Sequence, residues 1–260
     1  MSTTHEAGWA HAPGALRSPA WLQPPRDPNA LVPHLWSLTA HKNDAGELTV
    51  GGLPLPELVA EVNTPAYVLD EADFRARARA FRDAFADYDV FYAGKAFLCT
   101  TVARWVAEEG LSLDVCSGGE LTVAERAGFD MARVGFHGNN KSVHEIERAV
   151  TLGVGRIILD SFHEIERVAE VAARLGRTQR VMVRVTAGVE AHTHEYIATA
   201  HEDQKFGFSI TNGAAYDAVR RVVEAPTWSS WDCTPTSAAR SSTPPGSRSR
   251  PAGCSRCTRG

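Results

Sequence analysis

Short apolar runs alternate with amphipathic stretches through the middle of the chain, from about Pro65 onward. The runs show little polar alternation, which is typical of parallel strands covered on both faces. The predicted strands are residues 66–69, 89–93, 112–115, 133–136, 156–159 and 180–185, with predicted helices that include 74–85, 100–109 and 164–175. Strand–helix units at even spacing favour a (β/α)8 barrel over a doubly wound sheet. The pattern therefore predicts an α/β fold, an incomplete TIM-type barrel over residues 63–225 with about six of eight units.

Three predicted helices begin with the same pattern, Ser-x-x-Glu, at residues 117–120, 142–145 and 161–164. In such a capping box the serine and glutamate side chains each bind a backbone N–H that the first helical turn leaves without a partner. The pattern therefore predicts helix starts at these three serines.

The segments before and after this region lack the alternation of strands and helices. Residues 1–30 are rich in Pro, Ala and His without periodicity, which predicts a flexible arm. Residues 31–62 hold short apolar pieces around a turn-forming stretch at 43–46, which predicts a hairpin, and a short helix is expected at 56–61. Residues 226–260 contain no Leu, Ile, Val, Lys or Glu, and at face value predict a disordered basic extension.

Composition narrows the function classes. The chain has 260 residues and a net charge of −4, divided into −8 before residue 226 and +4 after it. An acidic body gives no reason to expect nucleic-acid binding. No apolar run reaches the roughly 20 residues of a membrane helix, and no signal pattern is seen, so we expect a cytoplasmic protein without a membrane partner. Five cysteines at irregular spacing do not indicate a disulfide framework.

Lys95 is the main candidate for chemistry. It follows the apolar run 89–93 at a predicted strand end, where barrel enzymes carry their catalytic groups. A lysine in partly apolar surroundings can form a Schiff base with an aldehyde cofactor. The alternative is a loop lysine whose ammonium group stays in water, which composition alone favours.

A metal site is a weaker hypothesis, which rests on histidines and cysteines elsewhere in the chain. His192 and His194 are two residues apart, with His201 nearby, but zinc needs three or four converging ligands. Cys254 and Cys257 form a single Cys-x-x-Cys without a second pair. We therefore expect no metal.

Several ordered motifs carry a family resemblance. They are Tyr-Ala-Gly-Lys-Ala at 92–96, Ala-Arg-Trp at 103–105, Leu-Asp-Val-Cys-Ser-Gly-Gly-Glu-Leu at 113–121, His-Gly-Asn-Asn-Lys-Ser at 137–142, Gly-Val-Glu-Ala-His-Thr-His-Glu at 188–195 and Glu-Asp-Gln-Lys-Phe-Gly at 202–207. Together they resemble the fold-type III pyridoxal-phosphate decarboxylases, and among them the bacterial diaminopimelate decarboxylases, over residues 31–225. The resemblance implies pyridoxal 5'-phosphate as cofactor, held by Lys95.

The same resemblance implies roles for neighbouring residues. Asp114 and Glu120 match two acids that lie beneath the cofactor in this family, although Glu120 also fits a helix cap. Arg184 matches an arginine that lines the same pocket, with a strand-end ion pair as the alternative. His137 is expected on the cofactor side of the barrel.

His137, Asn139 and Asn140 keep two interpretations: they either line the pocket or form a turn. The Lys-Phe-Gly stretch at 205–207 resembles a family loop near the active site.

The family resemblance breaks off near Pro226. The family continues with a strand that ends His-x-His-Ile-Gly-Ser-Gln, which this chain lacks. Residues 227–243 can nevertheless be encoded by DNA that reads Asp-Leu-Glu-Leu-Val-Gly-Leu-His-Ser-His-Ile-Gly-Ser-Gln-Ile-Phe-Asp when the frame starts one base earlier. Our hypothesis is that a frameshift near Pro226 produced residues 226–260.

By resemblance, the implied function is the decarboxylation of meso-2,6-diaminopimelate to L-lysine and CO2, the last step of lysine biosynthesis, with an amino acid as substrate and a homodimer as the full-length form. The C-terminal β-domain of the family, which residues 31–62 would join, is missing, as are the later barrel strands. We therefore expect an inactive fragment that binds the cofactor loosely. The alternatives are another decarboxylase of basic amino acids with the same fold, and a non-catalytic binding protein with a basic tail.

Overall fold

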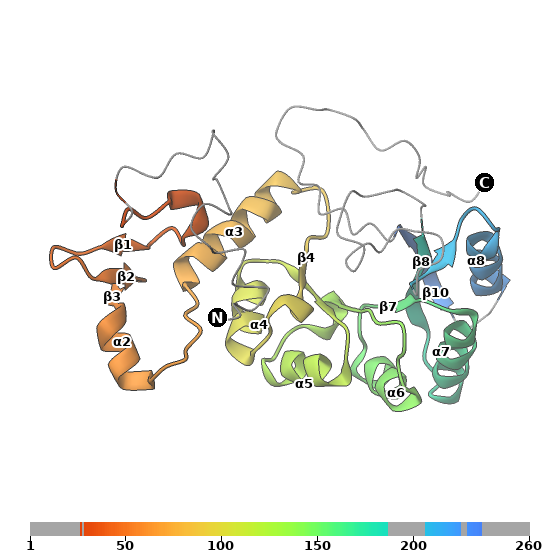
Figure 1. Cartoon of the computed structure of the whole chain (residues 1–260). Helices are drawn as coiled ribbons and strands as arrows, with labels where there is room; N and C mark the ends of the chain where they lie inside the picture. Colours follow the sequence, from red (N-terminus) through yellow and green to blue (C-terminus); the bar gives the residue numbers. More distant parts are fainter. Residues whose placement is uncertain (1–26, 28, 187–205, 225–227, 236–260) are drawn as a thin grey trace, which may run out of the picture. The chain divides into compact units, whose positions relative to one another are not determined.

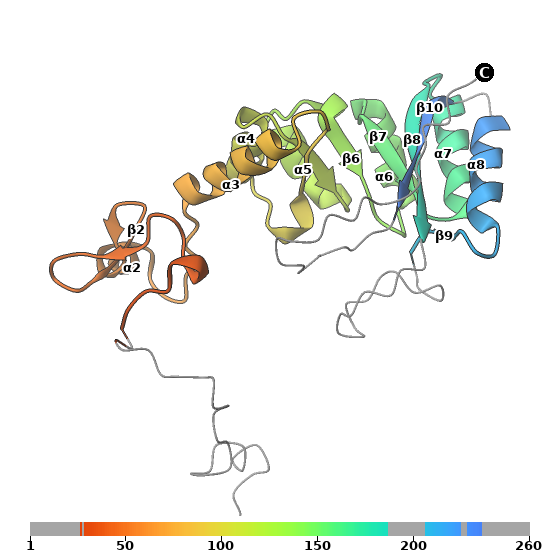
Figure 2. The ribbon, with the colours of Figure 1, turned by 90° about the horizontal axis from the view of Figure 1, so that it is seen from above.

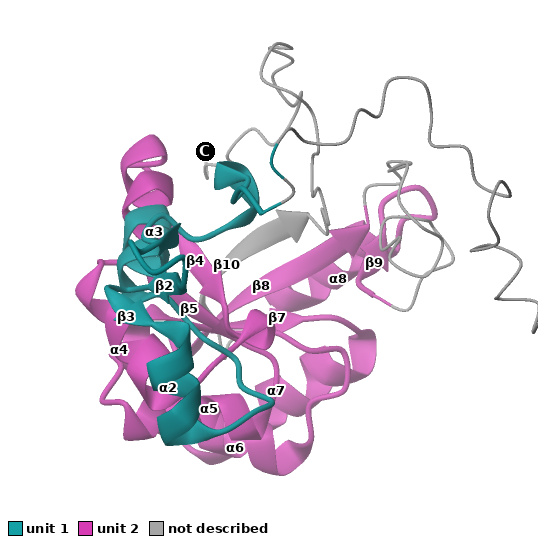
Figure 3. Cartoon of the chain, turned by 60° about the vertical axis from the view of Figure 1, so that its left-hand side comes forward, with its two compact units in different colours: residues 1–77 teal, residues 78–260 magenta. Residues whose placement is uncertain are grey.

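The computed structural model describes residues 27, 29–186, 206–224 and 228–235, with only the backbone of the last segment (Figure 1). The chain divides into two compact units, Met1–Arg77 and Ala78–Gly260 (Figure 3). The predicted arm at 1–30 falls almost wholly outside the described residues.

The first unit contains a small antiparallel sheet. Its strands β1 (His41–Lys42), β2 (Leu48–Val50) and β3 (Leu53–Pro54) pair in chain order, and helix α2 (Leu55–Val62) follows. The turn between β1 and β2 is closed by Asn43, whose N–H donates to the Glu47 carbonyl at 3.0 Å. The predicted hairpin and short helix are therefore present.

The predicted strand at 66–69 is wrong. The segment has no strand partner among the described residues, and the Tyr67, Val68 and Leu69 side chains are exposed. An apolar run becomes a strand only when a neighbour accepts and donates its backbone hydrogen bonds.

The second unit is an open parallel sheet with helices outside it. Its strands are β4 (Phe91–Ala93), β5 (Ser112–Val115), β6 (Val134–Phe136), β7 (Arg156–Leu159), β8 (Gln179–Thr186), β9 (Phe208–Ser209) and β10 (Trp228–Pro235). They pair in the order β10-β8-β7-β6-β5-β4, and β9 pairs with β8. The helices are α3 (Glu71–Ala84), which starts in the first unit, α4 (Thr100–Glu108), α5 (Gly118–Arg126), α6 (Val143–Leu152), α7 (Phe162–Arg174) and α8 (Ala214–Glu224). This order, with each strand beside the next in sequence from β4 to β8, is the arc of a barrel rather than a doubly wound sheet.

The core lies between the sheet and the helices that cover it. The short apolar runs supply completely buried side chains such as Leu113, Phe136 and Ile157, and α4 and α6 add Val106 and Ile146. Helices α7 and α8 lie side by side against the β8 end of the sheet (Figures 1 and 2). Burial of these strands on both faces explains why the runs lack polar alternation.

Part of the tail departs from its prediction. Disorder was expected from residue 226, but Trp228–Pro235 forms β10 and pairs with β8 in parallel over most of its length. Backbone groups make these bonds whatever the side chains, so the open edge of β8 can pair with a polar segment. Residues 236–260 lie outside the described part of the chain.

No helix in the described part of the chain is both long and apolar enough to cross a membrane.

Candidate functional site

Lys95 lies directly after β4, in a single 3-10 turn, Gly94–Ala96. A Cβ at Gly94 would lie 2.7 Å from the Asp114 carbonyl oxygen, so only glycine lets this turn pack against β5. The Tyr92 hydroxyl donates to the Phe97 carbonyl at 2.8 Å and closes the loop around the turn. The sequence thus brings an exposed Lys95 to the carboxyl end of β4, as predicted.

Asp114 and His137 meet at the carboxyl ends of the next two strands. Asp114 pairs with Ala93 on one side and with Gly135 on the other. The distance between His137 Nε2 and Asp114 Oδ1 is 3.3 Å, and each side chain keeps 26% exposure. A Cβ at Gly135 would lie 2.8 Å from Asp114 Oδ1. The glycine therefore leaves the space that the carboxylate occupies.

Cys116 lies in the loop after β5. Burial raises the pKa of its thiol, the Glu120 carboxylate raises it further, and the Lys95 ammonium opposes both.

Glu120 has a helix-capping role in the structure. Its N–H donates to Ser117 Oγ at 3.3 Å, and its carboxylate accepts the Cys116 N–H at 2.6 Å. The cap therefore differs from the predicted box, because the carboxylate accepts the N–H of the residue before the serine.

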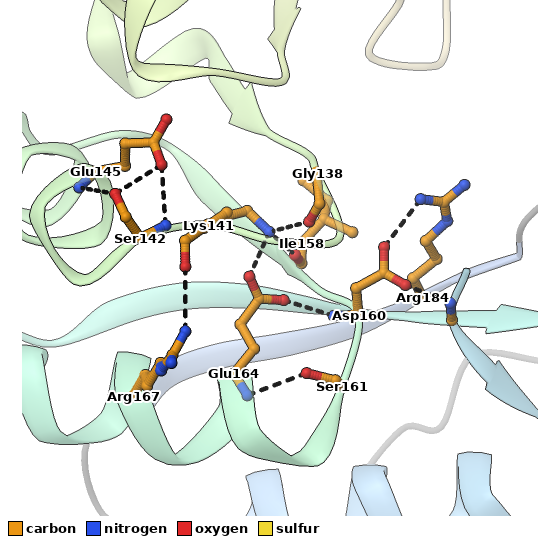
Figure 4. Close-up of polar contacts among 11 residues, drawn as sticks. Gly138, Lys141, Ser142, Glu145, Ile158, Asp160, Ser161, Glu164, Arg167 and Arg184 are labelled. Carbon is orange, nitrogen blue, oxygen red and sulfur yellow. Dashed lines mark hydrogen bonds and ion pairs between the residues drawn. The ribbon is translucent and has the colours of Figure 1, made fainter. Parts of the chain in front are cut away.

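Arg184 forms the strand-end ion pair that was the alternative to a pocket role. Its Nη1 lies 3.0 Å from Asp160 Oδ2, and the Asp160 side chain is only 2% exposed (Figure 4). The guanidinium also lies over the Phe206 ring, 4.4 Å from its centroid. The Gly207 N–H donates to the other Asp160 oxygen. The described part of the 205–207 stretch thus joins the carboxyl end of the sheet.

Lys141 and Glu164 form a buried ion pair that sequence reasoning missed. Lys141 Nζ lies 2.7 Å from Glu164 Oε1, with the two side chains 1% and 7% exposed (Figure 4). Lys141 had been noted only within a motif, and Glu164 only as a capping residue. The available signal was a lysine immediately before a helix-capping serine, which alone says nothing about burial.

The remaining predicted candidates lie in an exposed bend or outside the described residues. Asn139 and Asn140 lie exposed in a bend after β6, as turn formers would. His192, His194, His201, Cys254 and Cys257 are outside the described residues. Within the described ranges, no group of three or more His, Cys, Asp or Glu residues could hold a metal ion.

The carboxyl edge of the sheet therefore carries an exposed lysine, a carboxylate–imidazole pair and a partly buried arginine. The lysine supplies an amine that can bind an aldehyde, and the carboxylate can stabilise positive charge on a nitrogen beside it. The charge of the arginine is compensated by the Asp160 carboxylate.

Comparison with known proteins gives a consistent result. A family model described as the pyridoxal binding domain of pyridoxal-dependent decarboxylases matches residues 71–226. Diaminopimelate decarboxylase of Mycobacterium leprae is 52% identical over 221 residues, covering 84% of this chain and 47% of the relative. The Mycobacterium tuberculosis protein of the same name is 54% identical over 193 residues, covering 74% and 43%.

Solved structures agree on the architecture. Diaminopimelate decarboxylase from M. jannaschii, in complex with L-lysine, matches with a TM-score of 0.69 and 28% identity, covering 76% of this chain and 47% of that one. Lysine decarboxylase from Selenomonas ruminantium matches with a TM-score of 0.58 at 21% identity, covering 70% and 44%. The chain spans about half the length of the curated relatives it matches, and its fold is an incomplete barrel of this type.

Proposed function

The chain belongs to the pyridoxal-dependent decarboxylase family, and from that premise we propose that it is the lysine-bearing part of a diaminopimelate decarboxylase. The reaction would convert meso-2,6-diaminopimelate to L-lysine and CO2. The observation that carries the proposal is the position of Lys95 at the carboxyl end of β4, beside the strand that bears Asp114, within the matched residues.

The residues on this edge fit pyridoxal phosphate. Lys95 is exposed and its amine can bind the cofactor's aldehyde. The space left by Gly135 is occupied by the Asp114 carboxylate, which His137 contacts from the next strand. Lys95 would thus hold the cofactor at the end of β4, next to the strand that carries the Asp114 carboxylate. When bound, the cofactor supplies the electron sink for decarboxylation.

The chain's own residues would then have distinct tasks. Asp114 would place an anion at the end of the strand beside Lys95, and His137 would hold the Asp114 carboxylate in place. Arg184, held by Asp160 and covered by Phe206, would line the pocket rather than carry a free charge.

Substrate choice is supported by the relatives rather than by pocket geometry. Those reported above with more than 50% identity are both named diaminopimelate decarboxylases. The similarity to a lysine decarboxylase is at 21% identity and supports the fold alone.

A chimera tests the proposed substrate. Residues 31–225 would replace the matching part of the Mycobacterium leprae relative, and lysine formation from meso-diaminopimelate would be measured beside lysine, ornithine and arginine decarboxylation. We expect lysine from diaminopimelate and its loss in Lys95→Ala. Decarboxylation of another basic amino acid in preference would contradict the proposed substrate.

Borohydride reduction tests the role of Lys95 in the full chain. After incubation with pyridoxal phosphate and reduction, peptide mapping should find the pyridoxyl group mainly on Lys95, with Lys42→Ala as a control that leaves labelling unchanged. Equal labelling of Lys42 and Lys95 would contradict a specific site. We expect a low labelled fraction, and stoichiometric labelling would overturn the expectation of loose binding.

The frameshift remains part of the proposal. The family match ends at residue 226, where the alternative reading frame begins to resemble the family. Sequencing the gene across codons 222–232 tests this hypothesis. An intact reading frame, without the family sequence in the alternative frame, would contradict it.

We also propose that the full-length protein is a cytoplasmic homodimer. Sedimentation of the repaired full-length protein tests the dimer, and cell fractionation tests the compartment.

A further inference from the structure

Lys141 is almost completely buried at the carboxyl edge of the sheet, and each of its three ammonium protons has an acceptor. Nζ donates to the Gly138 carbonyl, the Ile158 carbonyl and Glu164 Oε1, each at 2.7 Å (Figure 4). Lysine is rarely buried to this extent unless it is paired. Three acceptors match the three donors of an ammonium group. Burial lowers the pKa of Lys141, and the Glu164 carboxylate opposes that effect.

Glu164 extends the network towards Arg184. Its second oxygen accepts the Asp160 N–H at 2.7 Å. The Asp160 side chain in turn binds Arg184 and the Gly207 N–H. A continuous set of polar contacts therefore runs from the loop after β6, past the end of β7, to β8 and the segment before β9.

The other end of the network reaches the Asp114–His137 contact. The carbonyl that Lys141 holds belongs to Gly138, the residue after His137. Gly138 has φ +113°, and a Cβ there would lie 3.0 Å from the Cys116 carbonyl oxygen. The backbone after His137 therefore packs closely against the residue that follows β5, and Lys141 donates a hydrogen bond to it.

We propose that Lys141, together with Glu164, is a positioning residue for the cofactor site. It fixes the loop that bears His137 and the strand end that bears Asp160, and so sets His137 and Arg184 relative to Lys95. This inference rests on the proposed function, because it assigns Lys141 to the pocket in which Lys95 would bind pyridoxal phosphate. A shift of about 1 Å at such a site is enough to reduce its function strongly.

Gln179 provides a matched control at the opposite end of the sheet. Its side chain is also buried and donates to the Val154 carbonyl at 3.0 Å and the Arg180 carbonyl at 2.9 Å. It lies at the start of β8, away from the carboxyl edge. Gln179→Leu therefore removes buried hydrogen bonds without touching the proposed network.

The test uses the full chain with two readouts. The first is pyridoxyl labelling of Lys95 after borohydride reduction, divided by the folded fraction from circular dichroism. The second is hydrogen exchange at residues 137–140 and 160 without any cofactor. We expect Lys141→Met to lower Lys95 labelling about tenfold and to speed exchange at these amides, with Gln179→Leu within about twofold of the parent in both.

Each outcome bears on one of the two ideas. If Lys141→Met is labelled like the parent and exchanges like it, the positioning role is wrong while the proposed function stands. If the parent itself shows no preference for Lys95, the proposed function fails, and exchange alone decides whether Lys141 orders the edge. If Lys141→Met does not fold, the double variant Lys141→Met/Glu164→Gln replaces it, because no uncompensated charge is then buried.

Discussion

Helices α6 and α7 begin with the same Ser-x-x-Glu pattern but use the glutamate differently. In both, the serine hydroxyl accepts the glutamate N–H at 3.2 Å. At α6, the Glu145 carboxylate returns to the Ser142 N–H at 2.9 Å and completes a capping box. At α7, the Glu164 carboxylate binds Lys141 and the Asp160 N–H.

The difference teaches which half of a local motif depends on the rest of the fold. The serine half, in which the hydroxyl accepts the glutamate N–H, concerns neighbours in the chain and is present at both helix starts. The glutamate half depends on which donors the fold brings within reach. Glu164 meets the buried Lys141, and burial raises the pKa of Glu164 even beside that cation. Burial also acts to raise the pKa of Glu145, but hydrogen bonds from Ser142 and Gly118 leave that pKa below its ordinary value.

The largest expected effect comes from breaking the buried pair. Lys141→Met should lower the free energy of unfolding by about 3–5 kcal/mol, because the Glu164 carboxylate loses the cation that compensates its burial. Urea denaturation followed by circular dichroism measures this. The double variant Lys141→Met/Glu164→Gln should recover most of the loss, and a double variant as unstable as the single one would contradict the pairing.

A smaller effect is expected at the other helix start. Glu145→Gln should cost about 1 kcal/mol, because one amide group cannot accept from both Ser142 and Gly118, although water can replace the lost bonds. The same urea titration measures this loss of unfolding free energy. A loss as large as that of Lys141→Met would contradict the proposed difference between the starts of α6 and α7.

Acid should reduce the difference in the free energy of unfolding between Glu145→Gln and the parent. The pKa of Glu145 is lower in the folded state, so its contribution is present above the ordinary carboxyl pKa and lost as pH falls through the folded value. Urea titrations from neutral to acid pH measure this difference. A difference that stays constant or widens on acidification would contradict the assigned direction.

The two serines should differ slightly. Both hydroxyls accept the glutamate N–H, but Ser142 Oγ also donates to Glu145 Oε2 at 2.7 Å. Ser142→Ala should therefore lower the free energy of unfolding by about 1 kcal/mol, and Ser161→Ala by somewhat less. Thermal or urea unfolding of both variants provides the comparison. A clear excess at Ser161 would mean that the buried pair, too, depends on the serine.

Much of the fold follows from local pattern. Apolar runs predicted β5 and β7 with the same bounds, because strands buried on both faces need continuous apolar residues. The run at 66–69 failed and Trp228–Pro235 was missed for related reasons. Strand formation also depends on an available partner edge, which no short stretch of sequence reveals.

The candidate site was predictable to a similar extent. Lys95, Asp114 and His137 lie at strand ends, where the alternation of elements and the family motifs placed them. Lys141 and Asp160 were missed as members of a network, because their contacts join residues 23 and 24 positions apart in the chain. Arg184 was placed at the correct edge, with its partner found only in the structure.

The close approach at Gly135 has a consequence for how this sequence can vary. Because a Cβ at position 135 would lie 2.8 Å from Asp114 Oδ1, a larger residue there requires the Asp114 carboxylate to move. Since His137 contacts the same oxygen, a change at position 135 acts on both members of the Asp114–His137 contact.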